Sequence, residues 1–142
     1  MREILFRGKS TENGEWEYGV PFFEEDYETI KGQTFICANI IDHYSTIYDL
    51  HRYCEQVIAD TLGQYTGLTD KNGKEIFEGD IVIWKFENHD TDIIADVIFY
   101  NGGFCLKNKD SILDCYPALK ICDMWSYEVI GNIYDNPKLL EV

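Results

Sequence analysis

The sequence has few basic residues and no long apolar run, and both absences narrow the possible functions. Only 12 lysines and arginines stand against 26 aspartates and glutamates, so the formal net charge is −14. Direct binding of nucleic acid is not expected, because no cluster of lysine and arginine could neutralise phosphates. No apolar stretch reaches the about 18 residues of a membrane span, and the opening residues lack the apolar segment of a signal peptide. We expect a cytoplasmic protein that does not bind membranes.

The short motifs of common catalytic and metal sites are also missing. The chain has no Cys-x-x-Cys and no Gly-x-Ser-x-Gly, so neither a zinc knuckle nor a hydrolase nucleophile is indicated. Its cysteines are an odd number without a recognisable spacing, and we expect them to be reduced and mostly buried; they are Cys37, Cys54, Cys105, Cys115 and Cys122. The sequence predicts no enzyme, no catalytic or metal-binding residue and no cofactor.

What the chain does have is the composition of a folded β protein. Of its 142 residues, 45% are hydrophobic and 15% aromatic, which is too apolar for a disordered chain. From position 80 onward, short extended runs alternate with turn signals, a spacing typical of a small barrel or sandwich. The runs are DIVIWKF, IIADVIFYN, GFCLKN, LKICDM and YEVIGNIY. We predict an SH3-like β-barrel over 61–142, ending in a short helix that Asn136 caps and Pro137 begins.

Residues 1–60 are predicted to form a separate N-terminal β subdomain. The runs REILFRG and EWEYGV, joined through Asn13-Gly14, predict a β-hairpin. TFICANII is typical of a buried strand, and FFEEDYE of a loop or short helix. Residues 47–58 fit both a helical and a strand pattern, and we expect a helix over 47–53 followed by a strand over 54–58.

The segment from Gly63 to Val82, GQYTGLTDKNGKEIFEGDIV, is rich in glycine but does not predict a phosphate-binding loop. Such a loop is followed by a helix whose amides face the anion, and no helical pattern follows here. Asp70 can instead accept hydrogen bonds from its own turn, and Asn72-Gly73 can adopt the left-handed conformations of a tight hairpin. Gly79 is expected to turn the chain before the next strand.

This segment, together with YEVIGNIYDNPKLL at 127–140, closely resembles the YopX family of phage and prophage proteins. The opening MREILFRG…WEYG is similar to that family's N-terminal hairpin, whereas 20–59 resembles it weakly. The resemblance implies a mostly β fold with a C-terminal SH3-like barrel, a bacterial cytoplasmic setting and no established activity. The matching residues are largely turn formers and caps; they are Gly63, Gln64, Gly67, Asp70, Asn72, Gly73, Gly79, Asp80, Gly131, Asn132 and Pro137.

Two weak metal patterns have simpler interpretations. On a helix, His51 and Cys54 could share an ion, with His43 nearby, but two ligands do not make a zinc site. The acidic run ENHDTD at 87–92 lacks the central glycine and the closing glutamate of a calcium loop, and an exposed hairpin tip explains it better. The same reasoning assigns the acidic run EEDYE at 24–28 to a solvated loop.

Function is predicted from the surface that this composition implies. Most aromatic residues fall at strand positions that build a core, but ten tyrosines are too many for two small subdomains to bury. Exposed aromatics rimmed by acids suit a protein partner or self-association. We predict a non-enzymatic phage or prophage accessory protein that binds an unknown protein. The alternatives are an acidic decoy of a host nucleic-acid-binding protein and a cryptic metal-dependent hydrolase or nuclease.

Overall fold

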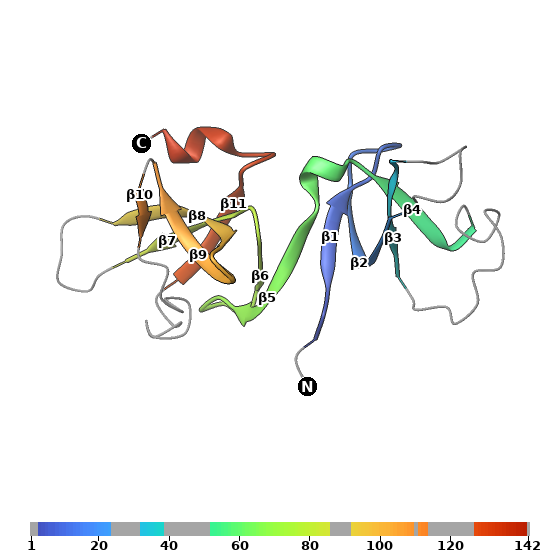
Figure 1. Ribbon diagram of the computed structural model, residues 1–142. Helices are drawn as coiled ribbons and strands as arrows, with labels where there is room; N and C mark the ends of the chain where they lie inside the picture. Colours follow the sequence, from blue (N-terminus) through green and yellow to red (C-terminus); the bar gives the residue numbers. More distant parts are fainter. Residues whose placement is uncertain are drawn as a thin grey trace. The chain divides into compact units, whose positions relative to one another are not determined.

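The computed structural model describes residues 3–23, 32–38, 52–85, 92–109, 111–113 and 127–141. The chain divides into two compact units, residues 1–64 and 65–142 (Figure 1). The sequence had placed this division after residue 60. Both units are built from antiparallel strands, so the expected mainly β fold is confirmed. No helix of the described residues is long and apolar enough to cross a membrane.

In the N-terminal unit, four strands pair in the order β4-β3-β2-β1. β1 (Phe6–Lys9) and β2 (Trp16–Phe23) form the expected opening hairpin. β3 (Thr34–Cys37) pairs with β2 and with β4 (Cys54–Val57), which confirms the strand predicted from residue 54. A 3-10 turn, η1 (Ala59–Thr61), leads into the first residues of β5 (Gly63–Thr69). Of the helix predicted over 47–53, only 52 and 53 are described, and both are helical.

Strand β2 changes partners at its midpoint. Residues 16–19 pair with β1, and residues 20–23 pair with β3. Gly19 permits this change, because a Cβ there would lie 2.2 Å from the carbonyl oxygen of Cys37. Pro21 falls in the second half, beyond the residues that pair with β1, where its missing N–H costs that ladder nothing.

The free edge of β4 is hydrogen-bonded to the opening hairpin. Ser10 forms an isolated bridge with Val57, and the amides of Thr11 and Ile58 donate to the carbonyls of Gln56 and Lys9 at 2.9 and 2.8 Å. The edge of β4 is thereby partly covered, which limits its use as a template for another strand.

One sequence prediction is wrong in this unit: Cys37 and Cys54 are not reduced but form a disulfide. They are direct partners at the last pair of the β3–β4 ladder, and cross-strand partners bring their Cβ atoms close enough for a bond. Their sequence separation of 17 residues gave no sign of this pairing. Cys105 is buried and in no disulfide, as expected; Cys115 and Cys122 lie outside the described residues.

In the C-terminal unit, the sheet runs β10-β9-β8-β7-β11. Its strands are β7 (Asp80–Trp84), β8 (Ile93–Tyr100), β9 (Gly103–Asn108), β10 (Ser111–Leu113) and β11 (Tyr127–Asn132). The core residues between them include Val82, Ala95, Val97, Leu106 and Tyr127. Within the described residues the sheet is open, so the predicted SH3-like barrel is not confirmed. The run LKICDM lies outside the described residues.

The glycine-rich segment forms a hairpin whose turn is built around Asp70. β5 continues into this unit and pairs with β6 (Glu75–Phe77). Asp70 Oδ1 accepts from the amides of Asn72 and Lys74 at 2.8 and 2.9 Å. Gly73 has φ of +81°, as predicted, but Asn72 is not among the residues with positive φ. A strand follows each turn of this segment, as predicted, and no helix does.

The chain ends in the expected short helix, a 3-10 helix, η3 (Pro137–Leu140). Asn136 precedes it but makes no side-chain capping bond there. Its Oδ1 instead accepts from the amide of Asn132 at 3.3 Å. Asn136 is therefore the N-cap residue by position, as predicted, but its side-chain oxygen bonds to the preceding turn and not to the helix.

Candidate functional site

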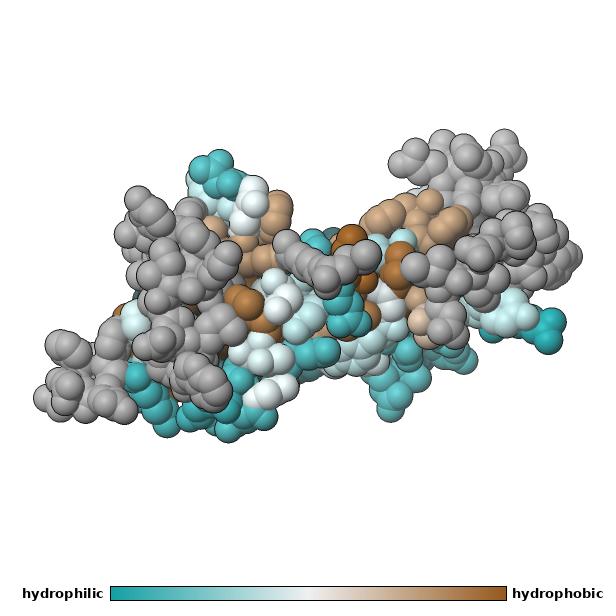
Figure 2. All heavy atoms as spheres, turned by 90° about the horizontal axis from the view of Figure 1, so that it is seen from below, coloured by the Kyte–Doolittle hydropathy of each residue, from teal (hydrophilic) through white to brown (hydrophobic). Residues whose placement is uncertain are grey.

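Exposed large apolar side chains gather in the N-terminal unit. Six of the eight found among the described residues belong to it; the eight are Ile4, Tyr18, Val20, Phe23, Tyr53, Ile58, Phe99 and Tyr100. Figure 2 shows brown and tan surface among the teal hydrophilic residues. Single exposed apolar residues are ordinary, whereas neighbouring ones suggest an interaction surface.

Two of these residues are neighbours on one face of β2. Tyr18 and Val20 are 46% and 37% exposed, and the two-residue period of a strand points them to the same side. Val20 pairs with Cys37, which in turn pairs with Cys54. The half-buried Phe22 continues the row and packs against Phe35 and the two cysteines. We call Tyr18, Val20 and Phe22 the β2 surface.

Cations and an indole ring border this surface. Trp16 lies two residues before Tyr18, and the guanidinium of Arg7 stands 4.4 Å from the centre of its ring. The ammonium of Lys9 is 5.4 Å from the same ring. Such stacking holds a tryptophan in one orientation. The β2 surface is therefore continued along the strand by a tryptophan that two cations contact.

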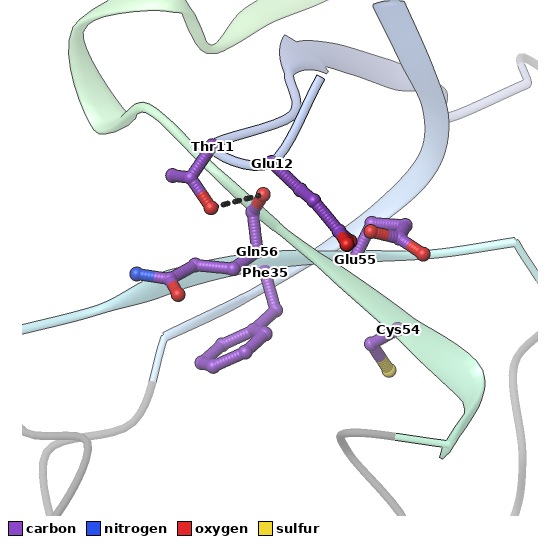
Figure 3. A pocket seen from close by; sticks show the side chains of 6 residues that line it. All are labelled: Thr11, Glu12, Phe35, Cys54, Glu55 and Gln56. Carbon is purple, nitrogen blue, oxygen red and sulfur yellow. Dashed lines mark hydrogen bonds between the residues drawn. The ribbon is translucent and has the colours of Figure 1, made fainter. Parts of the chain in front are cut away.

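A pocket of about 300 Å³ lies beside the disulfide, at the far edge of the same unit (Figure 3). Thr11 and Glu12 of the opening hairpin form one wall, and Glu55 and Gln56 of β4 form the other; Phe35 and Cys54 complete the lining. The Thr11 amide and hydroxyl both donate to the Gln56 carbonyl, at 2.9 and 3.3 Å. These two bonds fix the distance between the walls.

The hairpin wall is held from within by Ser10. Its Oγ accepts from the amides of Glu12 and Asn13 at 3.1 and 3.4 Å, and only 1% of the residue is exposed. Glu12 and Glu55 are exposed at the pocket. Their side chains point to one side in Figure 3, and that of Gln56 to the other. The pocket therefore has walls joined by hydrogen bonds, and its two glutamates give it a negative charge.

The metal-ligating residues considered from sequence are mostly outside this description. His43, His51 and His89 lie outside the described residues, as do Glu87, Asn88, Asp90 and the run 24–28. Asp92 is exposed, and Cys54 is in the disulfide. Within the described ranges, no group of three His, Cys, Asp or Glu side chains is placed to hold a metal ion.

Burial is the largest single influence on the pKa of two carboxyl groups described in the C-terminal unit. Burial raises the pKa of Asp96, and a backbone hydrogen bond and the charge of Lys107 oppose that rise. At Asp70, burial would also raise the pKa, but backbone hydrogen bonds from Val129, Lys74 and Asn72 outweigh it and leave the pKa below its ordinary value of 3.8. A carboxylate held ionised by several amides is a structural element of a turn.

Comparison with known proteins agrees with the motif at the centre of the chain. A family model described as "YopX protein" matches residues 5–141.

This chain belongs to the YopX family. A crystal structure of protein EF1440 from Enterococcus faecalis is similar over 99% of both chains, at 29% sequence identity and a TM-score of 0.56. No curated protein matches. In this YopX protein, the two aspartates of the central motif accept hydrogen bonds from backbone amides. Asp80, 1% exposed, accepts from the Phe77 amide at 2.8 Å, and Asp70 has three such bonds.

Sequence reasoning missed the β2 surface and the pocket. It predicted that some aromatic residues would be exposed, but it did not place them on this strand. The pocket joins residues about 45 positions apart, as the Thr11–Gln56 contact shows. The alternation Trp16-x-Tyr18-x-Val20 was the available signal, because it leaves an apolar row beside charged residues.

Proposed function

We propose that this YopX protein is a non-enzymatic phage or prophage accessory protein that binds another protein through its N-terminal unit. The observation that carries the proposal is the β2 surface, where Tyr18 and Val20 stay exposed side by side on a fixed strand. Tyrosine brings a large contact area at low entropic cost, which makes it frequent in interfaces. The C-terminal unit, an SH3-like module in this proposal, carries the family motif.

The charge of the chain supports a partner that is itself basic at the rim of the contact. The net charge is −14, and Glu12 and Glu55 are exposed at the pocket. Complementary charge raises association rates and selects partners, whereas the apolar contact supplies most of the affinity. Two copies of the chain would repel each other through the same charge, so self-association would need apolar contacts.

The test is affinity capture by the tagged full-length protein from nuclease-treated lysate of its bacterial host, at low and at high salt. The proposal predicts a defined partner that is retained in high salt, because apolar contacts are not screened. A set of basic nucleic-acid-binding proteins that is lost in high salt would favour the acidic decoy instead. Capture that is equal for wild type and Tyr18→Ser would contradict the assignment to the β2 surface.

A further inference from the structure

The disulfide and the pocket meet at one residue. Cys54 is among the six residues that line the pocket, whereas Cys37 is not. The two cysteines, 7% and 4% exposed, are otherwise buried. A reagent that approaches this disulfide through the pocket reaches Cys54 first.

We propose that Cys54 is a site of thiol–disulfide exchange, which small thiols reach through the acidic pocket. This inference does not depend on the proposed protein partner. A thiolate attacks Cys54 Sγ, the Cys37–Cys54 bond breaks, and Cys37 leaves as a thiolate that takes up a proton. A second thiol then attacks the mixed disulfide, which releases the external disulfide and the Cys54 thiol. The protein disulfide is reduced, and two thiols are oxidised.

The charge of the pocket selects among thiols. Glu12 and Glu55 belong to the lining of the pocket and are exposed. A thiol that carries an ammonium group is attracted to this lining, and one that carries an anion is repelled, most strongly at low ionic strength. Selectivity between the two kinds of thiol therefore reports the route of entry.

Exchange also releases one end of β4. The disulfide joins the last pair of the β3–β4 ladder, and on its other side β4 is held by the bonds of Thr11 and Ile58. Without the covalent link, the Cys54 end of the strand is held by the β3–β4 ladder, because the bonds of Thr11 and Ile58 lie toward the other end of β4. Reduction is expected to loosen the strand that carries the pocket wall while leaving the C-terminal unit unchanged.

The first experiment measures reduction of the oxidised full-length protein by cysteamine and by 2-mercaptoethanesulfonate, with rates expressed per thiolate. We expect cysteamine to be several-fold faster at low salt, relative to the same ratio for a small reference disulfide. Glu12→Gln and Glu55→Gln should lower this preference. Glu75→Gln is the matched control, because it removes one exposed charge from the other unit and should leave the preference unchanged.

Two further readouts complete the test. Alkylation during reduction, followed by peptide mass spectrometry, should find the mixed disulfide on Cys54, and amide hydrogen exchange should become faster in the β3–β4 ladder but not at Lys74 or Val129. The proposal is overturned if the mixed disulfide forms on Cys37, or if Glu75→Gln lowers the preference as much as the pocket variants do. It also fails if the air-oxidised protein has five free thiols, the full cysteine content of the chain.

Discussion

Asp70 does more than shape its own turn. Its Oδ1 holds the amides of Asn72 and Lys74, and its Oδ2 accepts from the amide of Val129 at 3.0 Å, 59 residues further along the chain. The Lys71 amide adds a bond to the Tyr127 carbonyl at 3.0 Å. The turn therefore covers the outer edge of β11, which would otherwise present unpaired backbone groups.

Asp70→Asn should destabilise the protein by about 2–4 kcal/mol. An amide has one acceptor oxygen, so its NH₂ group must face at least one backbone N–H, and a buried donor loses its partner. Urea denaturation measures the change. Glu75→Gln, at an exposed position, is the control, and an unchanged midpoint for Asp70→Asn would show that the two-sided contact is unimportant.

Because the pKa of Asp70 is lowered in the folded state, the free energy of unfolding depends on pH in the acid range. Its carboxylate is favoured in the folded state, so its contribution is fully present above the ordinary value of 3.8 and is lost as the pH falls through the lower folded value. The difference in unfolding free energy between wild type and Asp70→Asn should therefore shrink as the pH falls below about 4. Denaturation curves at several pH values measure it, and a difference that grows in acid would contradict this sign.

Gly73→Val should destabilise the protein by about 1–3 kcal/mol, because a β-branched residue is strained at positive φ. A Cβ at Gly73 would meet nothing within 4 Å, so the cost is one of backbone conformation alone. Gly103→Ala is a matched control with equal space and no positive φ. Equal denaturation midpoints for the two variants would mean that the turn does not need glycine.

At the scale of elements, the sequence predicts what is local and misses what is distant. The hairpin turns at Gly14 and Gly73 were both visible, since each needs only its own few residues, and both glycines have positive φ in the structure. The disulfide, the Thr11–Gln56 contact and the Asp70–Val129 bond each join residues that only the folded sheet brings together. β10 was missed because a strand of three residues has no readable period.

The disulfide is expected to stabilise the N-terminal unit through β3 and β4. It closes a loop with a sequence separation of 17 residues, and a loop of that size corresponds to about 3 kcal/mol of chain entropy in the unfolded state. The double variant Cys37→Ser and Cys54→Ser should unfold at lower urea concentration than the oxidised wild type. Reductant should bring the wild type close to the variant and leave the variant unchanged; a wild type that is insensitive to reductant would contradict this.

At the scale of the whole molecule, the two units have different roles in this account. The C-terminal unit holds most of the residues that match the YopX motif, and Asp70 and Asp80 there are buried in backbone hydrogen bonds. The N-terminal unit holds most of the exposed apolar side chains, the disulfide and the pocket. Sequence similarity within the motif therefore reports the fold, and binding is assigned to the other unit.

The most direct test of this assignment is the affinity of a captured partner for three forms of the full-length protein: wild type, Tyr18→Ser with Val20→Ser, and Tyr100→Ser. All three substituted side chains are exposed, so each variant should fold. We predict that the double variant on β2 binds at least about tenfold more weakly, as expected for the centre of an interface, and that Tyr100→Ser binds like wild type. Unchanged affinity of the double variant, or a loss confined to Tyr100→Ser, would contradict the proposal that the N-terminal unit is the binding part.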